Sequence, residues 1–425
     1  MTEGTPHYPT DGNVRPSPMP SGPLPRFSEH RDAEAILPVG RPGRELCLYP
    51  ARAGYDLQQE LDFLSNRVLE PNIFFSGRFL APAMPRLEDR VVRLALVRDL
   101  NQSRSRIRFL MPFSIERPGF SIGAPILRAW ANPFGPLGTP LLDMEDAAET
   151  LDNLFEALGQ PDNGLPGVLV LPDLRLNGPF AQLARAVAIG RNLPITVADT
   201  YRRPMLDSRL EGEAYLAGTI SAGHRREVRR QWKGLSAYGE VAYRVARSPE
   251  DIRLRMEEFL TLEALGWKGK QRTALVMDRL RAAFAREAIT NLAESDAVRI
   301  HTIDLDGVAI ASMIVFLMGG EAYTWKTTYD EAYARFSPGK LLMSALTGWH
   351  LDDPNITRTD SCTQDDHPIM SRFWKEREKM GTLVIGLQAN RDRDMRQAAA
   401  QLHLYRNTRN MAKMLRDKIR AFALR

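Results

Sequence analysis

The feature that most constrains the fold is a run of three strand-like segments followed at once by a helix start. VRIHTIDLDG, VAIASMIVFLMGG and EAYTWKTTYD fill residues 298–330 and are rich in β-branched and aromatic residues, which favour strands. The pair Asp306–Gly307 predicts a β-hairpin turn between the first two. Segments typical of a helix, a strand (RTDSC), a helix and a strand (TLVIGL) follow. This order predicts an α/β (α+β) fold with mixed, mostly antiparallel sheets flanked by helices.

The helix after the third strand begins in the segment FSPGKLL, residues 336–342. Ser337 is a candidate N-cap, and Pro338 suits the first helical position, where its missing N–H costs nothing. Gly339 leaves the first turn without a side chain, so free amides and the helix dipole could receive a phosphate or pyrophosphate. An ordinary capped core helix is the alternative. A nucleotide P-loop is excluded, because Ala334 and Leu341 stand where that motif needs Gly and Ser or Thr.

Length and composition limit the class of protein. A chain of 425 residues is long enough for two or three domains. Because no apolar run reaches 18 residues and the N-terminus lacks a secretory signal pattern, neither a transmembrane helix nor secretion is expected. Cys47 and Cys362 are the two cysteines, too few for a disulfide framework, so a reducing cytoplasm is the expected location.

Four stretches of different character divide the chain. Residues 1–43 contain nine prolines and are expected to be disordered. Residues 44–207 and 208–390 each alternate helices and strands, and we predict an N-terminal and a C-terminal domain there. Residues 391–425 carry eight Arg and two Lys against three Asp and are predicted to form a basic helix. Since the net charge of the whole chain is only +5, the basic character belongs to the tail, and no nucleic-acid partner is expected.

The C-terminal domain opens with a segment predicted to be one long helix over residues 211–239. Leu216, Ile220, Val228 and Leu235 share one face, and the opposite face is basic. Its cations are Arg225, Arg226, Arg229, Arg230 and Lys233. Either this face or the basic tail could contact lipid phosphates at the inner membrane, and a cyclic dinucleotide is a further possible ligand of the tail; a solvated face is the alternative.

Several segments resemble the CelD-type acetyltransferase family of bacterial polysaccharide biosynthesis, a branch of the GNAT superfamily. The similar segments are RRQWKGL, GEVAYRV, FLTLEALGWKGK, IDLDGVAIAS, YDEAYARFSPGKLL and DSCTQDDHPIMSRFWKERE, with LPGVLVLPDLRLNGPFAQLAR and TYRRPML upstream. The resemblance implies two tandem GNAT units, similar in plan to FemAB-type aminoacyl transferases. It also implies acetyl-CoA, or another acyl-CoA, as co-substrate.

The resemblance further implies where the co-substrate binds. Pyrophosphate is expected at the helix start, and pantetheine is expected along the strand before it. The motif is imperfect, because the run from Arg335 to Gly339 has one residue more than the family pattern. The expected cofactor-binding residues are Trp325, Lys326, Thr327, Arg335, Ser337, Pro338, Gly339, Lys340 and Leu341. For the strand residues, packing of the side chains is the alternative.

Acyl transfer to an amine requires a general base and a group that polarises the carbonyl. The candidate catalytic residues are Asp360 and His367 in DSCTQDDHP, and Glu263 before the loop LGWKGK. A solvated turn is the alternative for the polar cluster. Cys362 is expected to be a core residue rather than a nucleophile. The spacing of these groups matches no zinc pattern, so no metal is expected.

The acceptor is expected to meet Trp267, Lys268, Tyr329 and Asp366. Trp267 could stack on a sugar ring and Lys268 could bind a phosphate, whereas an apolar loop anchor is the alternative. Tyr329 is also a candidate for the acid that protonates the leaving group, because Phe373 and Trp374 stand where many GNAT enzymes have a tyrosine.

The predicted function is acyl-CoA-dependent N-acyl transfer, most simply acetyl transfer, to an amino sugar of an exopolysaccharide or its precursor. One alternative is a FemAB-like aminoacyl transfer that depends on tRNA. Another is an inactive tandem GNAT protein that serves as a binding or regulatory component of a polysaccharide synthesis system. The partners expected are a saccharide acceptor and, through the basic C-terminal helix, the inner-membrane surface.

Overall fold

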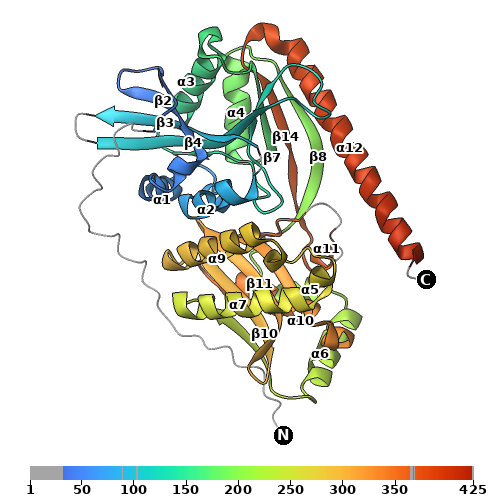
Figure 1. The fold of residues 1–425 in the computed structure, drawn as a ribbon. Helices are drawn as coiled ribbons and strands as arrows, with labels where there is room; N and C mark the ends of the chain where they lie inside the picture. The colour runs from blue at the N-terminus through green and yellow to red at the C-terminus, as the bar shows by residue number, and fades with distance from the viewer. Residues whose placement is uncertain (1–31, 89, 102–103, 364–366, 368, 424–425) are drawn as a thin grey trace.

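The computed structural model describes residues 32–88, 90–101, 104–363, 367 and 369–423. Within this part of the chain, fourteen strands form one sheet in the order β1-β2-β3-β4-β5-β7-β14-β8-β13-β12-β11-β10-β9, with β6 beside β4. Helices flank the sheet, and the chain forms two lobes (Figure 1). Among the described strands, the parallel pairs are β5–β7 and β12–β13. The predicted mixed, mostly antiparallel α/β fold is therefore confirmed.

The first lobe contains most of the N-terminal half of the chain. Its strands are β1 (Ala35–Pro38), β2 (Arg44–Pro50), β3 (Val92–Asn101), β4 (Arg104–Glu116), β5 (Ile126–Ala129), β6 (Leu141–Leu142), β7 (Val168–Arg175) and β8 (Ile195–Leu206). Its helices are α1 (Gln58–Ser65), α2 (Gly77–Leu87), α3 (Ala147–Gly159) and α4 (Pro179–Gly190), with 3-10 turns η1 (Ala51–Gly54), η2 (Ile73–Phe75) and η3 (Pro161–Asn163). Strand β1 pairs with β2, so the expected disorder of residues 1–43 is wrong for this segment.

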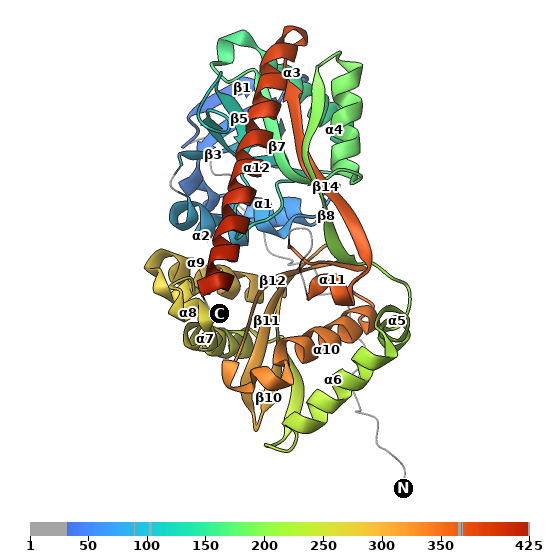
Figure 2. The ribbon, with the colours of Figure 1, turned by 90° about the vertical axis from the view of Figure 1, so that its right-hand side faces the viewer.

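The second lobe is built from residues after β8. Its strands are β9 (Val241–Ala246), β10 (Val298–Leu305), β11 (Val308–Met318), β12 (Glu321–Tyr329) and β13 (Arg358–Asp360). Its helices are α5 (Gly212–Thr219), α6 (Ala222–Leu235), α7 (Pro249–Leu265), α8 (Trp267–Lys270), α9 (Arg279–Glu294), α10 (Pro338–Asp352) and α11 (Met370–Phe373), with η4 (Leu275–Met277) and η5 (Glu331–Phe336). Figure 2 shows α7 and α9 on one side of β10–β12, and α6 and α10 on the other.

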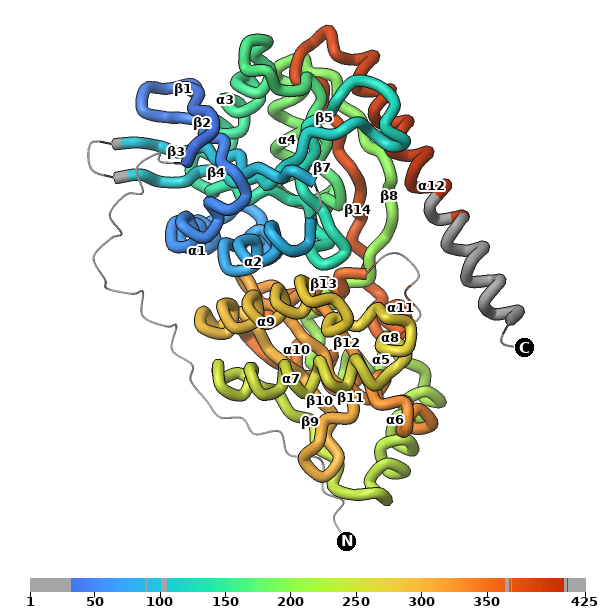
Figure 3. Tube along the Cα trace, in the orientation of Figure 1, coloured from blue at the N-terminus to red at the C-terminus, as the bar shows by residue number. Residues whose placement is uncertain are grey.

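The last strand, β14 (Glu376–Gly386), returns to the first lobe. It pairs with β7 on one side and β8 on the other, although the sequence-based boundary at residue 390 assigns it to the second domain. Strands β8 and β14 run side by side from one lobe toward the other (Figure 3). The lobes therefore share one hydrogen-bonded sheet. After η6 (Ala389–Arg391), the predicted C-terminal helix is confirmed as α12 (Asp392–Ala423).

Local turn chemistry accounts for one confirmed and one wrong prediction. Asp306 and Gly307 both have positive φ (51° and 81°) between the antiparallel strands β10 and β11, as a tight hairpin turn requires. The single helix expected over residues 211–239 is wrong, because the chain breaks into α5 and α6. Ile220 is extended at the break, and the Ser221 side chain accepts a hydrogen bond from the backbone N–H of His224 at 3.3 Å, which caps α6.

Aromatic packing joins the two lobes behind the sheet. Phe79 of α2 contacts Phe284 of α9 and Phe316 of β11, with ring centroids 5.3 and 5.8 Å apart. Arg78 adds a hydrogen bond from Nη1 to the carbonyl of Asn291 at 2.8 Å. One apolar core thus spans both lobes, which restrains their relative motion. In the described part of the chain, no helix combines the length and apolarity needed to cross a membrane.

Candidate active site

The strands β12 and β13 separate from each other in the middle of the second lobe. Their pairing covers only Glu321–Tyr323 against Arg358–Asp360, whereas β12 continues to Tyr329. After Asp360 the chain turns away through Cys362, which has a φ of 53°, and the Asp360 Oδ1 accepts the Cys362 N–H at 2.7 Å. The edge of β12 beyond Tyr323 is therefore not paired with β13.

A β-bulge shapes the unpaired stretch of β12. Ile314 is opposite Lys326, but Val315 is opposite Thr324, so Trp325 is the extra residue. Further along, the Asp330 N–H donates to the Ile310 carbonyl of β11. Because backbone groups alternate along an antiparallel pair, those of Thr327 and Tyr329 face away from β11, toward the open side.

The open side of β12 leads to the start of α10. Gly339 lies in the first turn, and a Cβ placed there would meet only a carbon of the Tyr329 ring, at 3.8 Å. The space above this turn is therefore free of close protein atoms. The prediction that α10 begins at Pro338 is confirmed. Lys340 extends from the same turn toward Glu227 of α6, with 3.8 Å between Nζ and Oε1.

Three of the residues expected at the pyrophosphate differ from the prediction. Ser337 occupies the N-cap position, but it is left-handed (φ 50°) and its side chain does not cap the helix; its Oγ accepts from Gln231 Nε2 at 3.2 Å. Arg335 lies over the rings of Tyr238 and Phe336 rather than at the first turn. Leu341 is buried in the core under α10.

Trp325 and Lys326 have different environments although the bulge joins them. The Trp325 ring packs among Phe79, Phe284 and Phe316, and its Nε1–H donates to the Phe134 carbonyl at 2.8 Å. Its side chain is thus a core group, as the packing alternative supposed. Lys326 is half-buried, and its Nζ lies 4.2 Å from the centre of the Phe134 ring.

The ammonium of Lys326 is poorly neutralised. Among the described residues, no carboxylate lies within ion-pair distance of its Nζ. Burial, followed by the charge of Lys268, lowers the pKa of Lys326 to about 8, and the charge of Glu263 opposes the shift. A lysine in this state gains from any negative charge placed beside it.

Glu263 and Lys268 form a fixed unit at the open edge. Glu263 is buried; its Oε1 accepts from Lys268 Nζ at 2.8 Å and its Oε2 accepts from the Leu275 N–H at 2.7 Å. Lys268 Nζ also donates to the Thr327 carbonyl at 2.8 Å. Since both carboxylate oxygens are engaged, Glu263 is better placed to hold Lys268 against β12 than to act as the general base. Trp267, before Lys268, is 46% exposed.

Asp360 lies at the joint between the lobes, fully buried. Arg175 Nη2 of β7 and Arg203 Nη1 of β8 approach its Oδ2 at 3.2 and 3.3 Å. Burial alone raises the pKa of a carboxyl group, but Arg203 and Arg175 outweigh it here, so the pKa of Asp360 is lowered. A buried carboxylate held by two arginines fits a structural role, and the geometry does not suit the predicted role as general base.

His367 is half-buried near the start of α11. Its Nδ1 accepts the Met370 N–H at 3.2 Å, and burial lowers its pKa. With Nδ1 acting as acceptor, the neutral ring carries its proton on Nε2 and is suited to donate a hydrogen bond. Asp366 lies outside the described residues. Within the described part, no group of three His, Cys, Asp or Glu side chains is arranged to hold a metal.

The structure therefore brings together Lys326, Thr327, Tyr329, Gly339, Lys340, Glu263 and Lys268, which the sequence distributes over three segments. Sequence reasoning missed Arg175 and Arg203, because each is a single arginine in a strand of the other lobe and has no local signal. It also missed Phe134, which contacts Lys326 from a Gly- and Pro-rich loop.

An open strand edge that ends on a helix N-terminus, beside an unneutralised lysine, is an arrangement suited to acyl transfer from a long, phosphate-bearing donor. The comparisons with known proteins give the same class. Residues 222–368 match the family model described as "Acetyltransferase (GNAT) domain". This segment contains β12, β13 and α10, so the chain carries a GNAT domain of the N-acyltransferase class.

The solved structure of FemX shares the overall fold. FemX is 9% identical and covers 78% of this chain and 96% of its own, with a TM-score of 0.52. A tandem GNAT protein from the clavulanic acid biosynthesis pathway is 14% identical, with 81% of this chain and 99% of its own covered and a TM-score of 0.38. No curated protein is significantly similar to this chain.

Proposed function

We propose that the protein transfers an acyl group, most simply acetyl, from acyl-CoA to the amine of an amino sugar in an exopolysaccharide or its precursor. The observation that carries the proposal is the open edge of β12, where Thr327 and Tyr329 turn their backbone groups away from β11 and the strand leads to the bare first turn of α10. The resemblance of the sequence to CelD-type enzymes supports the choice of acceptor.

The donor would lie along this edge. The Thr327 N–H and the backbone groups of Tyr329 would pair with the amides of the pantetheine arm, because the Thr327 carbonyl already accepts from Lys268. The Gly339 turn with Lys340 would receive the pyrophosphate. Free space above Gly339 fits a diphosphate that must approach the backbone closely. Bound acyl-CoA supplies a thioester, which is an activated acyl group.

Lys326 is the residue proposed to stabilise negative charge on the carbonyl oxygen. Its protonated side chain lies on the bulge at the inner end of the open edge, without a carboxylate partner among the described residues. A fixed cation in a partly dry site stabilises developing negative charge strongly. Lys268, held by Glu263 and bonded to the Thr327 carbonyl, would define the wall of the site.

The acceptor would approach over the loop after α7. Trp267 is partly exposed there and offers an aromatic face to a sugar ring, beside Lys268. His367 would donate its Nε2–H to the acceptor or to the leaving sulfur rather than remove a proton, because its Nδ1 already accepts a backbone N–H. No residue is assigned as the general base.

A second candidate is transfer from an RNA-borne aminoacyl donor. The observation that favours it is the position of the arginine-rich helix α6. Gln231 of α6 contacts Ser337 at the start of α10, so the basic face lies beside the expected donor site. Arg226, Arg229, Arg230 and Lys233 are exposed on this helix. Such a row of cations suits a polyphosphate backbone better than a single pyrophosphate.

Titration of acetyl-CoA into the purified protein by calorimetry tests the donor. Micromolar binding is expected, and Gly339→Glu is expected to weaken it at least tenfold, because the new side chain fills the free space and its carboxylate opposes the diphosphate. Gly339→Ala should change binding little, since its Cβ fits at 3.8 Å.

Gly190→Glu is the matched control, because this residue at the end of α4 also has no atoms within 4 Å of an added Cβ. It should bind like the wild type. Absence of binding to the wild type would overturn the acyl-CoA proposal. Binding of aminoacyl-tRNA in that case would support the second candidate, and binding of neither would indicate an inactive protein.

A further inference from the structure

The connection between α7 and α9 exposes an unusual amount of apolar side chain. Within residues 265–280, Leu265 is 73% exposed, Leu280 54%, Met277 50% and Trp267 46%. Single exposed apolar residues are common on any protein, but four large ones between the end of α7 and the start of α9 indicate a contact surface. We refer to these four residues as the acceptor-loop surface.

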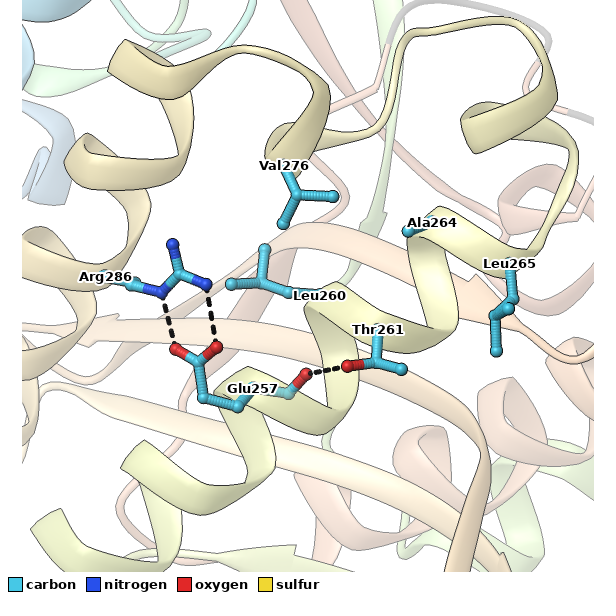
Figure 4. A pocket seen from close by; sticks show the side chains of 7 residues that line it. All are labelled: Glu257, Leu260, Thr261, Ala264, Leu265, Val276 and Arg286. Carbon is cyan, nitrogen blue, oxygen red and sulfur yellow. Dashed lines mark hydrogen bonds and ion pairs between the residues drawn. The ribbon is translucent and has the colours of Figure 1, made fainter.

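A groove adjoins this surface (Figure 4). It has a volume of about 310 Å³ and lies between α7 and the segment formed by η4 and α9. Leu260, Ala264, Leu265 and Val276 line it, and an ion pair between Glu257 and Arg286, at 2.6 Å, lies at one side.

The remaining lining residue, Thr261, does not add a free polar group. Its hydroxyl donates back to the Glu257 carbonyl at 2.9 Å, and the two charges of the Glu257–Arg286 pair satisfy each other. The groove therefore offers apolar walls without an unpaired donor or acceptor that would bind a polar ligand. An alkyl chain is the ligand that such walls suit.

The charges around the acceptor-loop surface are positive. Arg272 and Arg279 are exposed, and neither forms an ion pair with a described residue. Lys270 is neutralised by Glu331 at 2.5 Å, and Asp278, which caps α9, is paired with Arg281 at 3.5 Å. Exposed apolar groups, a tryptophan and unpaired arginines together are typical of segments that lie at the surface of an anionic membrane.

The acceptor-loop surface is continuous with the candidate active site. Trp267 precedes Lys268, whose Nζ bonds the Thr327 carbonyl on the open edge of β12. A membrane bound at this surface would thus lie beside the place where the acceptor enters.

We propose that the acceptor-loop surface docks on an anionic lipid bilayer, with an acyl chain of a lipid in the groove, Trp267 at the level of the headgroups, and Arg272 and Arg279 on lipid phosphates. The docking itself does not depend on the proposed function. The role of this docking in catalysis rests on the proposed function, because docking would present a membrane-borne amine to the open edge of β12. It also relocates the membrane contact that the sequence indicated for the basic tail.

Co-sedimentation with vesicles tests the proposal. The wild type is expected to bind phosphatidylcholine vesicles only when they contain phosphatidylglycerol. The variant Leu265→Ser/Met277→Ser/Leu280→Ser should bind roughly tenfold or more weakly, because three apolar side chains no longer enter the lipid. Arg272→Gln/Arg279→Gln should remove most of the preference for anionic vesicles and its sensitivity to salt.

A matched control removes apolar side chains elsewhere. Val91, just before β3 in the first lobe, and Val308, at the start of β11, are 71% and 67% exposed and do not line the groove, so Val91→Ser/Val308→Ser should bind vesicles like the wild type. Calorimetry with acetyl-CoA should give the same affinity for all these variants, so loss of docking is distinguished from failure of the donor proposal.

Three results would overturn the docking proposal. The first is equal or absent binding of the wild type to both kinds of vesicle. The second is loss of binding only on Arg416→Gln/Lys418→Gln/Arg420→Gln, which would assign the contact to the tail instead. The third is a dimer in sedimentation velocity that the apolar triple variant dissociates, which would assign the surface to a second copy of the chain.

Discussion

Lys326→Met is expected to lower the rate of acyl transfer by about 100-fold or more and, at the same time, to make the folded protein more stable. The loss of rate follows from the proposed role, because removal of one fixed group that stabilises the carbonyl oxygen typically has an effect of this size. The gain in stability follows from the cost of keeping a half-buried ammonium beside Phe134 and Lys268 without a close carboxylate.

The size of the stability effect depends on pH. The pKa of Lys326 is about 8 in the folded protein, against an ordinary value of 10.5, so the unfolded chain binds this proton more tightly. The charged lysine therefore opposes folding below about pH 8, and the penalty fades as the pH rises from about 8 to about 10.5. The difference in pKa corresponds to at most about 3 kcal/mol. Partial exposure reduces the expected gain to about 1–2 kcal/mol at neutral pH.

Thermal unfolding and steady-state turnover, measured on the same samples, check both halves of the prediction. Lys375→Met is the control, because Lys375 is exposed; neither its stability nor its turnover should change. Wild-type turnover should also fall as the pH rises through about 8, since the proposed role needs the protonated lysine. Lys326→Arg should move this decline to higher pH. Full turnover in Lys326→Met would remove Lys326 from the mechanism.

The parts of the fold that could be predicted from the sequence are those that local chemistry determines. The hairpin at Asp306–Gly307 and the start of α10 at Pro338 depend on turn and helix-start preferences of a few adjacent residues. The position of β14 in the sheet does not depend on such local preferences. Its sequence is typical of a strand, but its partners β7 and β8 lie some 200 residues earlier in the chain, and no local pattern distinguishes them from β13.

The candidate site was predicted in the same uneven way. The segment around Trp325 and Lys326 was identified, but the bulge that separates a core tryptophan from a poorly neutralised lysine depends on the register with β11. The sequence favours Asp360 as a base because it begins the densest cluster of titratable groups in the chain. Its neighbours in sequence are polar, whereas its partners in space are Arg175 and Arg203 of the other lobe. The two arginine partners determine the chemistry of this carboxyl group, and no sequence pattern indicates that they pair with it.

Asp360→Ala is expected to destabilise the protein by about 3–5 kcal/mol, because it leaves the buried guanidinium groups of Arg175 and Arg203 without their shared carboxylate. Arg175 retains Glu321 at 2.7 Å, whereas the remaining hydrogen-bond partners of Arg203 among the described residues are neutral, Tyr201 at 2.8 Å among them. Since the network joins β7 and β8 to β13, the substitution should destabilise mainly the contact between the two lobes. Urea unfolding measures the change, and Asp162→Ala, at an exposed position on η3, should leave the midpoint unaltered.

The contribution of Asp360 to stability depends on pH in a different way from that of Lys326, because the Asp360 carboxylate stabilises the folded protein whereas the Lys326 ammonium destabilises it. The pKa of Asp360 is lowered below its ordinary value of 3.8, so its contribution to stability is complete above that value and is lost as the pH falls toward the folded pKa. The midpoints of wild type and Asp360→Ala should therefore differ by a constant amount at neutral pH and converge only in acid.

Asp360→Asn separates the structural role of this residue from the predicted catalytic one. It keeps the size of the side chain but removes the charge, so under the structural interpretation it should lower the urea midpoint nearly as much as Asp360→Ala. Any loss of turnover should then follow the loss of folded protein. If Asp360→Asn instead folds with wild-type stability and loses turnover, Asp360 acts in the chemistry, and the two arginines hold a catalytic base rather than the joint between the lobes.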